Sequence, residues 1–270
     1  MKIQLQTPQL TIFESALFRT TSTLIQTDDF VLIVDPNWLP IEVQTIRAYV
    51  DSIKENRPIY LFFTHSDYDH IIGYKAFPEA KTIASKAFVD NPDKAKILEQ
   101  INDFDDENYI KRPYKIVYPT IDFVIKNDGE ILEIGNTKLQ FFNANGHNAD
   151  GLFLWIETLG VLIVGDYLSN IEFPSIYHSG NAYIQTLQKA EYLINHQKIK
   201  FLITGHGDFT TEIEEMKQRI TDSYEYIFLT LNSLKNKEQF DFNWLWQRYD
   251  FPKVMTKFHE GNLKVLSKEL

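Results

Sequence analysis

The stretch LFFTHSDYDHIIG, residues 61–73, places four side chains that can bind a metal ion within six positions. They are His65, Asp67, Asp69 and His70, and an apolar run leads directly into them. Buried imidazoles and carboxylates need partners, and a divalent cation can neutralise several of them at once. The pattern therefore indicates a metal site that follows the end of a strand.

The composition limits both the chemistry of such a site and the partners of the chain. The 270 residues are 44% apolar and contain no cysteine, so nitrogen and oxygen atoms must hold any metal. The formal net charge of -10 opposes attraction to phosphate backbones and to anionic membrane surfaces. We therefore expect a small-molecule substrate, no nucleic-acid partner and no membrane partner. Whether the chain forms an oligomer stays open.

The N-terminal segment MKIQLQTPQLTIFES alternates apolar with polar residues, which is typical of a strand and not of a signal peptide. No window of the sequence approaches the roughly 18 to 20 apolar residues of a membrane span. A cytoplasmic location is the resulting expectation.

Short strands separated by turn signals fill the first two thirds of the chain. Hairpin turns are expected at residues 127–129 and 158–160. Helical spacing of apolar residues occurs at about 41–55, 93–102 and 182–196, and again from about residue 211 onward. We therefore predict a metal-binding domain over residues 1–210 and a helical C-terminal extension over residues 211–270 that packs on it.

Further acids and histidines follow other apolar strands of the predicted domain. Asp35 comes after FVLIV, Asp166 after VLIVG and His206 after FLITG, while His147 stands in the segment NANGHNADG. A single acid at a strand end is usually a turn residue. The repeated occurrence favours one site, because loops at one edge of a sheet can converge.

The order and spacing of these motifs resemble the metallo-β-lactamase superfamily over about residues 1–210. Its members carry an H-x-H-x-D-H motif after a strand, then a Gly-His pair, an Asp after an apolar strand and a final Gly-His pair. The resemblance implies an α/β (α+β) fold, a four-layer αββα sandwich with a dinuclear metal site at one edge of its two sheets.

The resemblance also implies a role for each motif residue. One metal would be held by His65, Asp67 and His147, and the second by Asp69, His70 and His206. Asp166 would bridge the two metals. Asp35 would support the ligands from behind.

The chain departs from the family motif at its second position, where Asp67 replaces histidine. Either the carboxylate replaces the imidazole as a ligand, or Asp67 does not bind and the site holds one metal. As a ligand, Asp67 would remove a positive charge from the site, so that bound water would be less acidic and Mn or Fe would compete better with Zn. We expect two divalent ions, with zinc as the first expectation and iron or manganese as alternatives.

The expected reaction is hydrolysis of a small ester, lactone, thioester or phosphodiester by a metal-bound hydroxide. Asp67 or Asp69 would accept and relay the proton. A donor for the leaving group is expected in the segment YLSNIEFPSIYHSG, which offers Tyr167, Tyr177 and His178.

Two other functions remain open at this point. A glutamate at the position of Asp67 occurs in the flavodiiron branch of the superfamily, so a di-iron redox protein is one alternative, and a non-catalytic metal-binding protein is the other. The remaining polar candidates are expected to have supporting roles: Asp150 and Asp208 as turn or supporting residues, and His196 and His259 as structural residues.

Overall fold

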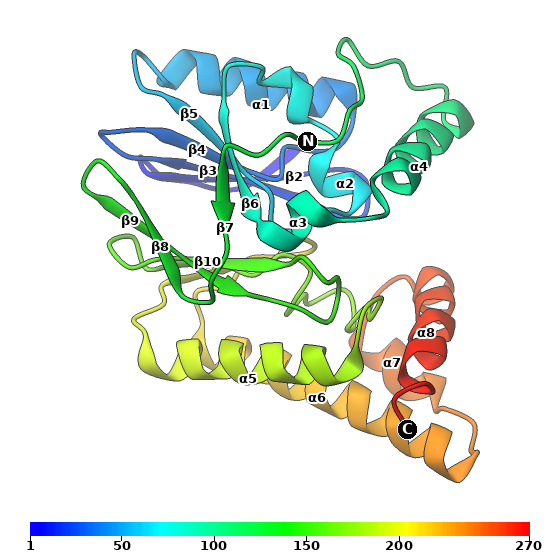
Figure 1. The fold of residues 1–270 in the computed structure, drawn as a ribbon. Coiled ribbons are helices and arrows are strands. Elements are labelled where there is room, and N and C mark those ends of the chain that lie inside the picture. The colour runs from blue at the N-terminus through cyan, green and yellow to red at the C-terminus, as the bar shows by residue number, and fades with distance from the viewer. The chain divides into compact units, whose positions relative to one another are not determined.

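The computed structural model describes residues 1–270 apart from the side chain of Pro252. The chain divides into two compact units, Met1–Phe141 and Phe142–Leu270. In the colours of Figure 1 the first unit runs from blue to green and the second from green to red.

The first unit is built on a seven-stranded sheet in which the strands follow one another in chain order. The strands are β1 (Lys2–Gln6), β2 (Leu10–Glu14), β3 (Thr21–Gln26), β4 (Val31–Val34), β5 (Ile59–Phe62), β6 (Lys81–Ser85) and β7 (Phe123–Ile125). β1 to β4 pair antiparallel, and β4 to β7 pair parallel. The N-terminal segment forms two strands where one was expected, because a turn between Thr7 and Leu10 reverses the chain.

Helices provide the crossovers that parallel strands require. They are α1 (Pro40–Ile53), α2 (Tyr68–Ile71), the 3-10 turn η1 (Tyr74–Ala76), α3 (Lys86–Asp90) and α4 (Lys94–Glu107). α1 buries Val43, Ile46 and Val50, which share one helix face, in the same core as Leu61 of β5 and Ile97 of α4. Because β4 and β5 are parallel neighbours, the residues that follow them emerge at the same edge of the sheet.

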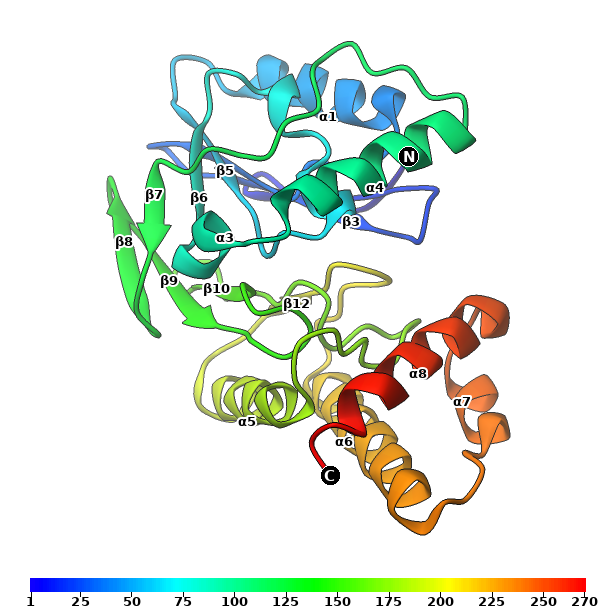
Figure 2. The same ribbon diagram turned by 45° about the vertical axis from the view of Figure 1, so that its right-hand side comes forward.

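The second unit contains β10 (Leu152–Ile156), β11 (Val161–Ile163) and β12 (Phe201–Ile203). β10 and β11 pair antiparallel, and β11 and β12 pair parallel with a crossover through α5 (Gly180–His196). The remaining helices are α6 (Ile213–Asn236), α7 (Phe242–Arg248) and α8 (Pro252–Leu266). α5 and α6 lie side by side, and Figure 2 shows α8 returning beside α6.

The helical C-terminal region that was predicted is therefore confirmed. Its residues Met216, Ile220 and Leu266 share a core with Phe153 of β10 and Leu162 of β11. The predicted domain boundary at residues 210 and 211 stays a prediction, since the division into compact units follows contacts and falls at residues 141 and 142.

One of the two predicted hairpins forms. β10 and β11 are joined by the expected turn at residues 158–160, but the turn at 127–129 does not join a hairpin. β7 pairs with β6, whereas β8 (Glu130–Ile134) pairs with β9 (Thr137–Asn143) through a turn at Gly135. Gly135 has φ 57°, and a Cβ there would lie 2.1 Å from an oxygen of the Asp29 carboxylate. Residues 127–129 therefore separate two strands, as predicted, but these strands pair with other partners and not with each other.

The predicted α/β class is confirmed: the strands form two sheets, and helices pack on strands in both units. Each unit supplies strands and the helices that cover them, which is the composition expected of an αββα sandwich. Among the described residues, no helix combines the length and apolarity that a membrane crossing requires.

Candidate metal centre

The first His/Asp cluster lies directly after β5 and consists of four side chains: His65, Asp67, Asp69 and His70. Asp67 immediately precedes α2, and this single helical turn places Asp69 and His70 next to the loop. The rings of His65 and His70 are buried, with centroids 4.1 Å apart.

A carboxylate oxygen lies near the Nε2 atom of each of these histidines. His65 Nε2 is 3.6 Å from Asp67 Oδ2, and His70 Nε2 is 3.4 Å from Asp69 Oδ2. The short loop and the short helix thus bring all four groups of the motif into two adjacent imidazole–carboxylate pairs.

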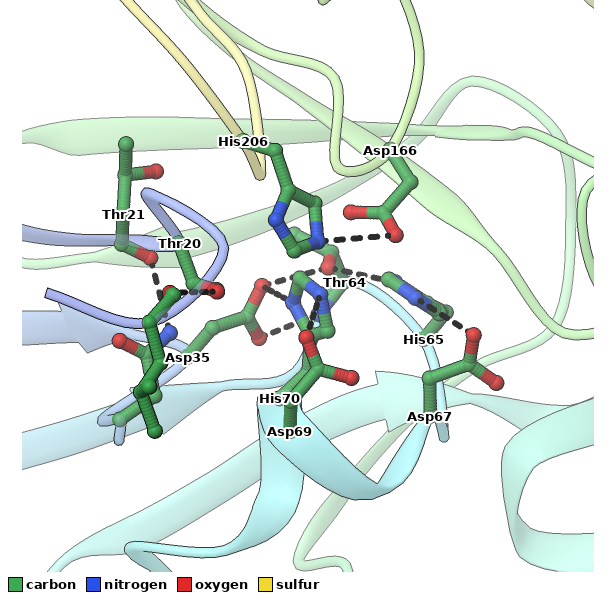
Figure 3. Close-up of polar contacts among 12 residues, drawn as sticks. Thr20, Thr21, Asp35, Thr64, His65, Asp67, Asp69, His70, Asp166 and His206 are labelled. Atoms are coloured by element: carbon green, nitrogen blue, oxygen red, sulfur yellow. Dashed lines mark hydrogen bonds and ion pairs between the residues drawn. The ribbon is translucent and has the colours of Figure 1, made fainter. Parts of the chain in front are cut away.

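Asp35 and Thr64 determine which nitrogen of each imidazole carries a proton (Figure 3). Asp35 accepts hydrogen bonds from Thr64 N at 2.9 Å, from Thr64 Oγ1 at 2.5 Å and from His70 Nδ1 at 2.9 Å. Since the Thr64 hydroxyl donates to Asp35, it accepts from His65 Nδ1, which lies 2.9 Å away. Both histidines therefore carry their proton on Nδ1 and their lone pair on Nε2, as a metal ligand needs.

The position of Asp35 depends on the turn after β4. Asp35 has φ 48°, a conformation that aspartate tolerates better than most residues. The Ser22 hydroxyl donates to the Asp35 carbonyl at 2.7 Å, and the Asn37 side chain donates to the carbonyl of Thr21 at 3.1 Å. β3 thereby holds the turn that aims the Asp35 carboxylate at Thr64 and His70.

Burial also affects Tyr68, which lies between the two carboxylates of the motif in sequence. Burial first, and then the charges of Asp69 and Asp67, raise the pKa of Tyr68 above its ordinary value. Its hydroxyl consequently stays neutral over the physiological range.

The second His/Asp cluster is built from three separate strand ends of the second unit. Its members are His147 in the loop before β10, Asp166 after β11 and His206 after β12. Asp166 Oδ2 lies 3.4 Å from His147 Nε2 and 3.3 Å from His206 Nε2. Figure 3 shows Asp166 and His206 of this cluster. One carboxylate oxygen thus faces two imidazole nitrogens.

The loop that carries His147 is fixed by close packing on α5 and by main-chain hydrogen bonds. Gly146 has φ 127°, and a Cβ there would lie 2.3 Å from the backbone of Tyr183, so only glycine permits this approach. His147 N donates to the Tyr167 hydroxyl at 2.9 Å, and this hydroxyl donates to the Asn145 carbonyl at 2.8 Å. Tyr167, a candidate proton donor from the sequence, is thus buried and bonded to the main chain, and burial raises its pKa.

His147 Nδ1 lies 2.7 Å from the carbonyl oxygen of Ser175. Because a carbonyl only accepts, Nδ1 carries the proton and Nε2 carries the lone pair toward Asp166. Tyr177 N also donates to the His147 carbonyl at 2.9 Å. The segment that contains Ser175 and Tyr177 therefore holds both the side chain and the main chain of His147.

A buried arginine holds the loops of the other two members. Arg219 of α6 donates from Nη1 to the carbonyl of Leu168 at 3.1 Å and to that of Asp208 at 2.9 Å. These carbonyls lie two residues after Asp166 and two residues after His206. α6 thereby connects the two strand ends.

The remaining candidates from the sequence lie at the edges of these clusters or apart from them. Tyr177 is 49% exposed with its ring centroid 5.1 Å from that of His147, and His178 is exposed next to it. Asp150 is buried, and Asp208 accepts from the Asn170 side chain. His196 bonds the Tyr192 carbonyl near the end of α5, and His259 is buried among the C-terminal helices.

Several residues that hold the clusters were not identified from the sequence. Thr64 stands beside His65, but a threonine before a motif is no signal by itself. Ser175 acts through its main chain, which leaves no trace in the side-chain pattern, and Arg219 lies far along the chain from the loops it bonds.

The donor atoms in both clusters fit a divalent metal. The described part of the chain includes groups of His and Asp side chains that could hold such an ion. Three of the four imidazoles have their Nδ1 bonded to an acceptor, and all four Nε2 atoms lie near a carboxylate oxygen. Nitrogen and oxygen sets of this kind suit zinc, and also iron or manganese.

The chain is similar to known proteins in sequence and in fold. The chain is 24% identical over 247 residues to a UPF0282 protein of Sulfolobus acidocaldarius, with 83% of this chain and 76% of that protein covered. Solved structures also share the fold. A sec-alkylsulfatase from Pseudomonas sp. has TM-score 0.70 at 12% identity, and a metallo-beta-lactamase family protein from Thermus thermophilus has TM-score 0.64 at 17% identity.

The two structures differ in how much of their own length is matched. The comparison covers 98% of this chain and 49% of the alkylsulfatase, so this chain spans about half the length of that enzyme. For the Thermus protein the coverage is 96% of this chain and 94% of that one. The family model of the metallo-beta-lactamase superfamily matches residues 16–230, a range that includes both His/Asp clusters. This protein belongs to the metallo-beta-lactamase superfamily.

Proposed function

We propose that this protein is a metal-dependent hydrolase whose two His/Asp clusters together hold two divalent ions. The observation that carries the proposal is the position of Asp166, whose Oδ2 lies within 3.4 Å of His147 Nε2 and 3.3 Å of His206 Nε2. A carboxylate oxygen that lies between two imidazole Nε2 atoms is the arrangement a bridging ligand needs, and the His147 Nε2 presents its lone pair to it. Membership of a superfamily of metal-dependent hydrolases supports the same assignment.

The proposed ligand sets follow the family pattern. One ion would be held by His65, Asp67 and His147, and the other by Asp69, His70 and His206. Asp166 would contribute to both. Zinc is the first candidate, because its sites combine histidine nitrogen with carboxylate oxygen.

Bound ions would supply a nucleophilic water at neutral pH and polarise the substrate oxygen. The chain's own residues orient the site: Asp35 and Thr64 fix the tautomers of His70 and His65, as Ser175 does for His147. These contacts avoid reorganisation of the ligands during turnover.

Proton transfer is assigned to the more exposed polar groups. Asp67 has a side chain that is 26% exposed, compared with 10% for Asp69, so Asp67 is the better relay to solvent. Tyr177 is half-exposed beside His147, and we assign it as the donor to the leaving group, with His178 as the neighbouring candidate.

The proposed substrate is a small ester, lactone, thioester or phosphodiester. The fold does not select among them, since one fold hosts many chemistries. The fold is similar to that of an alkylsulfatase and of metallo-beta-lactamases, which adds an alkyl sulfate and a β-lactam to the substrates worth testing.

The test is a hydrolysis panel on protein that has been stripped with chelator and reloaded with Zn, Mn or Fe. We expect turnover that disappears on stripping and returns with metal, and that is abolished in Asp166→Asn. Asp28→Asn, at an exposed carboxylate outside both clusters, is the matched control and should retain full activity. Turnover that survives both stripping and Asp166→Asn would contradict the proposal.

The second candidate is a di-iron redox protein. It is favoured by Asp67, whose carboxylate lies 3.6 Å from His65 Nε2 and gives the first cluster a second acid beside Asp69. Two Fe per chain with visible absorption, together with no hydrolysis of any substrate in the panel, would place this function first.

A further inference from the structure

A buried polar network lies between α6 and α8 in an otherwise apolar core. It consists of Tyr226, His259 and Asn262, each at most 1% exposed. The Asn262 side chain donates from Nδ2 to the Tyr226 hydroxyl at 2.7 Å, and this hydroxyl lies 2.9 Å from His259 Nδ1. Buried polar groups in an aromatic core destabilise the fold unless they are bonded, so this network calls for a reason beyond packing.

Asn262 uses its amide to hold a loop that is distant in sequence. Its Oδ1 accepts from Ile176 N at 2.7 Å, and its Nδ2 donates to the Pro174 carbonyl at 2.6 Å. A main-chain N–H can only donate and a carbonyl can only accept, so these two partners fix the orientation of the amide. The other hydrogen of Nδ2 is donated to the Tyr226 hydroxyl. Both the oxygen and the nitrogen of the Asn262 amide are therefore bonded.

The residue between these two anchors is Ser175, whose carbonyl accepts from His147 Nδ1 at 2.7 Å. Asn262 therefore fixes the backbone immediately before and immediately after the group that orients His147. The same loop continues to Tyr177, whose N–H donates to the His147 carbonyl. A continuous series of hydrogen bonds runs from α8 through the loop to a member of the second His/Asp cluster.

We propose that Asn262 is a positioning residue that sets the tautomer and direction of His147 through the Ser175 carbonyl. This inference rests on the proposed function, in which His147 Nε2 binds metal. By holding the carbonyl in place, Asn262 keeps the proton on Nδ1 and the lone pair directed toward Asp166. Removing a group that bonds a metal-binding histidine directly typically changes metal affinity about 10- to 100-fold, and because Asn262 acts through the Ser175 carbonyl we expect the lower end of this range.

The variant that tests this is Asn262→Asp, which has the same shape and retains an acceptor for Ile176 N. It loses both donated hydrogen bonds and places a carboxylate oxygen against the Pro174 carbonyl. Zinc affinity is measured by competition with a chromophoric chelator, and unfolding by denaturant is followed in parallel. We expect about 10-fold weaker zinc binding, the lower end of the range for partners of metal-binding histidines.

Met255→Ala is the control for a general loss of stability. Met255 is a buried side chain two turns earlier in α8 and has no polar group that could bond the loop. It should lower the stability of the fold while leaving zinc affinity at the wild-type value. Equal loss of affinity in Met255→Ala and Asn262→Asp would overturn the proposal.

A double-variant measurement separates positioning from a structural effect. In a His147→Ala background, Asn262→Asp should cause no further loss of zinc affinity, because its effect passes through His147. A further loss of equal size in that background would overturn the proposal. If Asn262→Asp does not fold, Asn262→Ser takes its place, since its hydroxyl is too short to bond both Pro174 and Ile176.

The two hypotheses fail in different ways. Wild-type protein that binds no metal would refute the proposed function, and the role of Asn262 would fall with it. Wild-type protein that binds zinc, together with an Asn262→Asp variant of unchanged affinity, would refute the role of Asn262 alone.

Discussion

The two His/Asp clusters contain the same kinds of side chain but are held in different ways. The first is formed by residues within six positions of each other, and a carboxylate and a hydroxyl at neighbouring strand ends orient its imidazoles. The second gathers residues from three strand ends, and its supports come from helices much later in the chain. One cluster therefore depends on local geometry and the other on the packing of the C-terminal helices.

The largest expected effect is at Asp35, which supports the first cluster. Asp35→Ala leaves the buried Nδ1 of His70 and the Thr64 main-chain N–H without their acceptor. Each buried donor that is left without an acceptor costs about 2 kcal/mol, so the loss of both bonds should lower the free energy of unfolding by about 4 kcal/mol. Urea denaturation measures this.

Asp28→Ala, at an exposed position of the same unit, is the control and should change stability by less than about 0.5 kcal/mol. Equal stabilities of Asp35→Ala and Asp28→Ala would show that the first cluster does not depend on Asp35.

The second expected effect is a pH dependence of stability that comes from His259 in α8, one of the helices that support the second cluster. Burial lowers the pKa of His259 from 6.5 to about 4. The unfolded chain therefore takes up this proton first, so the contribution of His259 is complete above pH 6.5 and is lost as the pH falls toward 4. The loss at pH 4 should be about 3 kcal/mol.

Carboxylates also titrate in this range, so the measured quantity is the difference between the wild type and His259→Gln. The Tyr226 hydroxyl that faces His259 stays neutral, because burial raises its pKa. Denaturation curves at pH 7, 5.5 and 4 should show the wild type losing stability relative to the variant. Parallel pH profiles of the two proteins would rule out this role of His259.

The third expected effect concerns the connection between the loops of Asp166 and His206. Arg219→Leu removes both donated hydrogen bonds to the Leu168 and Asp208 carbonyls. We expect the free energy of unfolding to fall by about 2 kcal/mol, because two buried carbonyls lose their donor. The ion pair that Arg219 also makes with Glu215 adds little, since the Glu215 side chain is 44% exposed. Lys217→Leu on the exposed face of α6 should be near neutral, and an equally neutral Arg219→Leu would contradict the proposed connection.

The smallest effect on stability is expected at Tyr177, where a comparison with His178 decides the assignment of a proton donor. Tyr177→Phe removes an exposed hydroxyl and should change stability by less than about 0.5 kcal/mol. If Tyr177 donates the proton, kcat should fall about 100-fold with KM unchanged. An unchanged kcat, with a reduced kcat in His178→Ala, would transfer the role to His178.

The contrast between the clusters also explains what the sequence could predict. Residues 61–73 indicate the first cluster because a loop and a helical turn bring neighbouring residues together, and Asp35 follows a parallel neighbour of β5. The strand ends at Asp166 and His206 could be predicted for the same reason. The C-terminal helices could be predicted from the helical spacing of apolar residues, and the α/β class from the resemblance to the superfamily.

The supports of the second cluster could not be predicted in this way. Asn262 and Arg219 bond loops that are distant from them in sequence, and their partners are main-chain atoms. Every residue has such atoms, so the sequence does not indicate which of them will be bonded. The hairpin predicted at residues 127–129 does not form for a related reason. Strand pairing depends on the partners available in the folded chain, and β7 and β8 each pair with another strand. Sequence patterns report local geometry well and long-range contacts poorly.

The first measurement to make is metal content, by elemental analysis of protein purified without chelator or nickel. Wild type and Asp67→Ala are compared side by side, because Asp67 is the one position where the chain departs from the family motif. We predict two Zn or Mn per chain in the wild type and about one in Asp67→Ala. One metal in both proteins would show that Asp67 is not a ligand and that the site is mononuclear. No metal in either protein would contradict the proposed hydrolase.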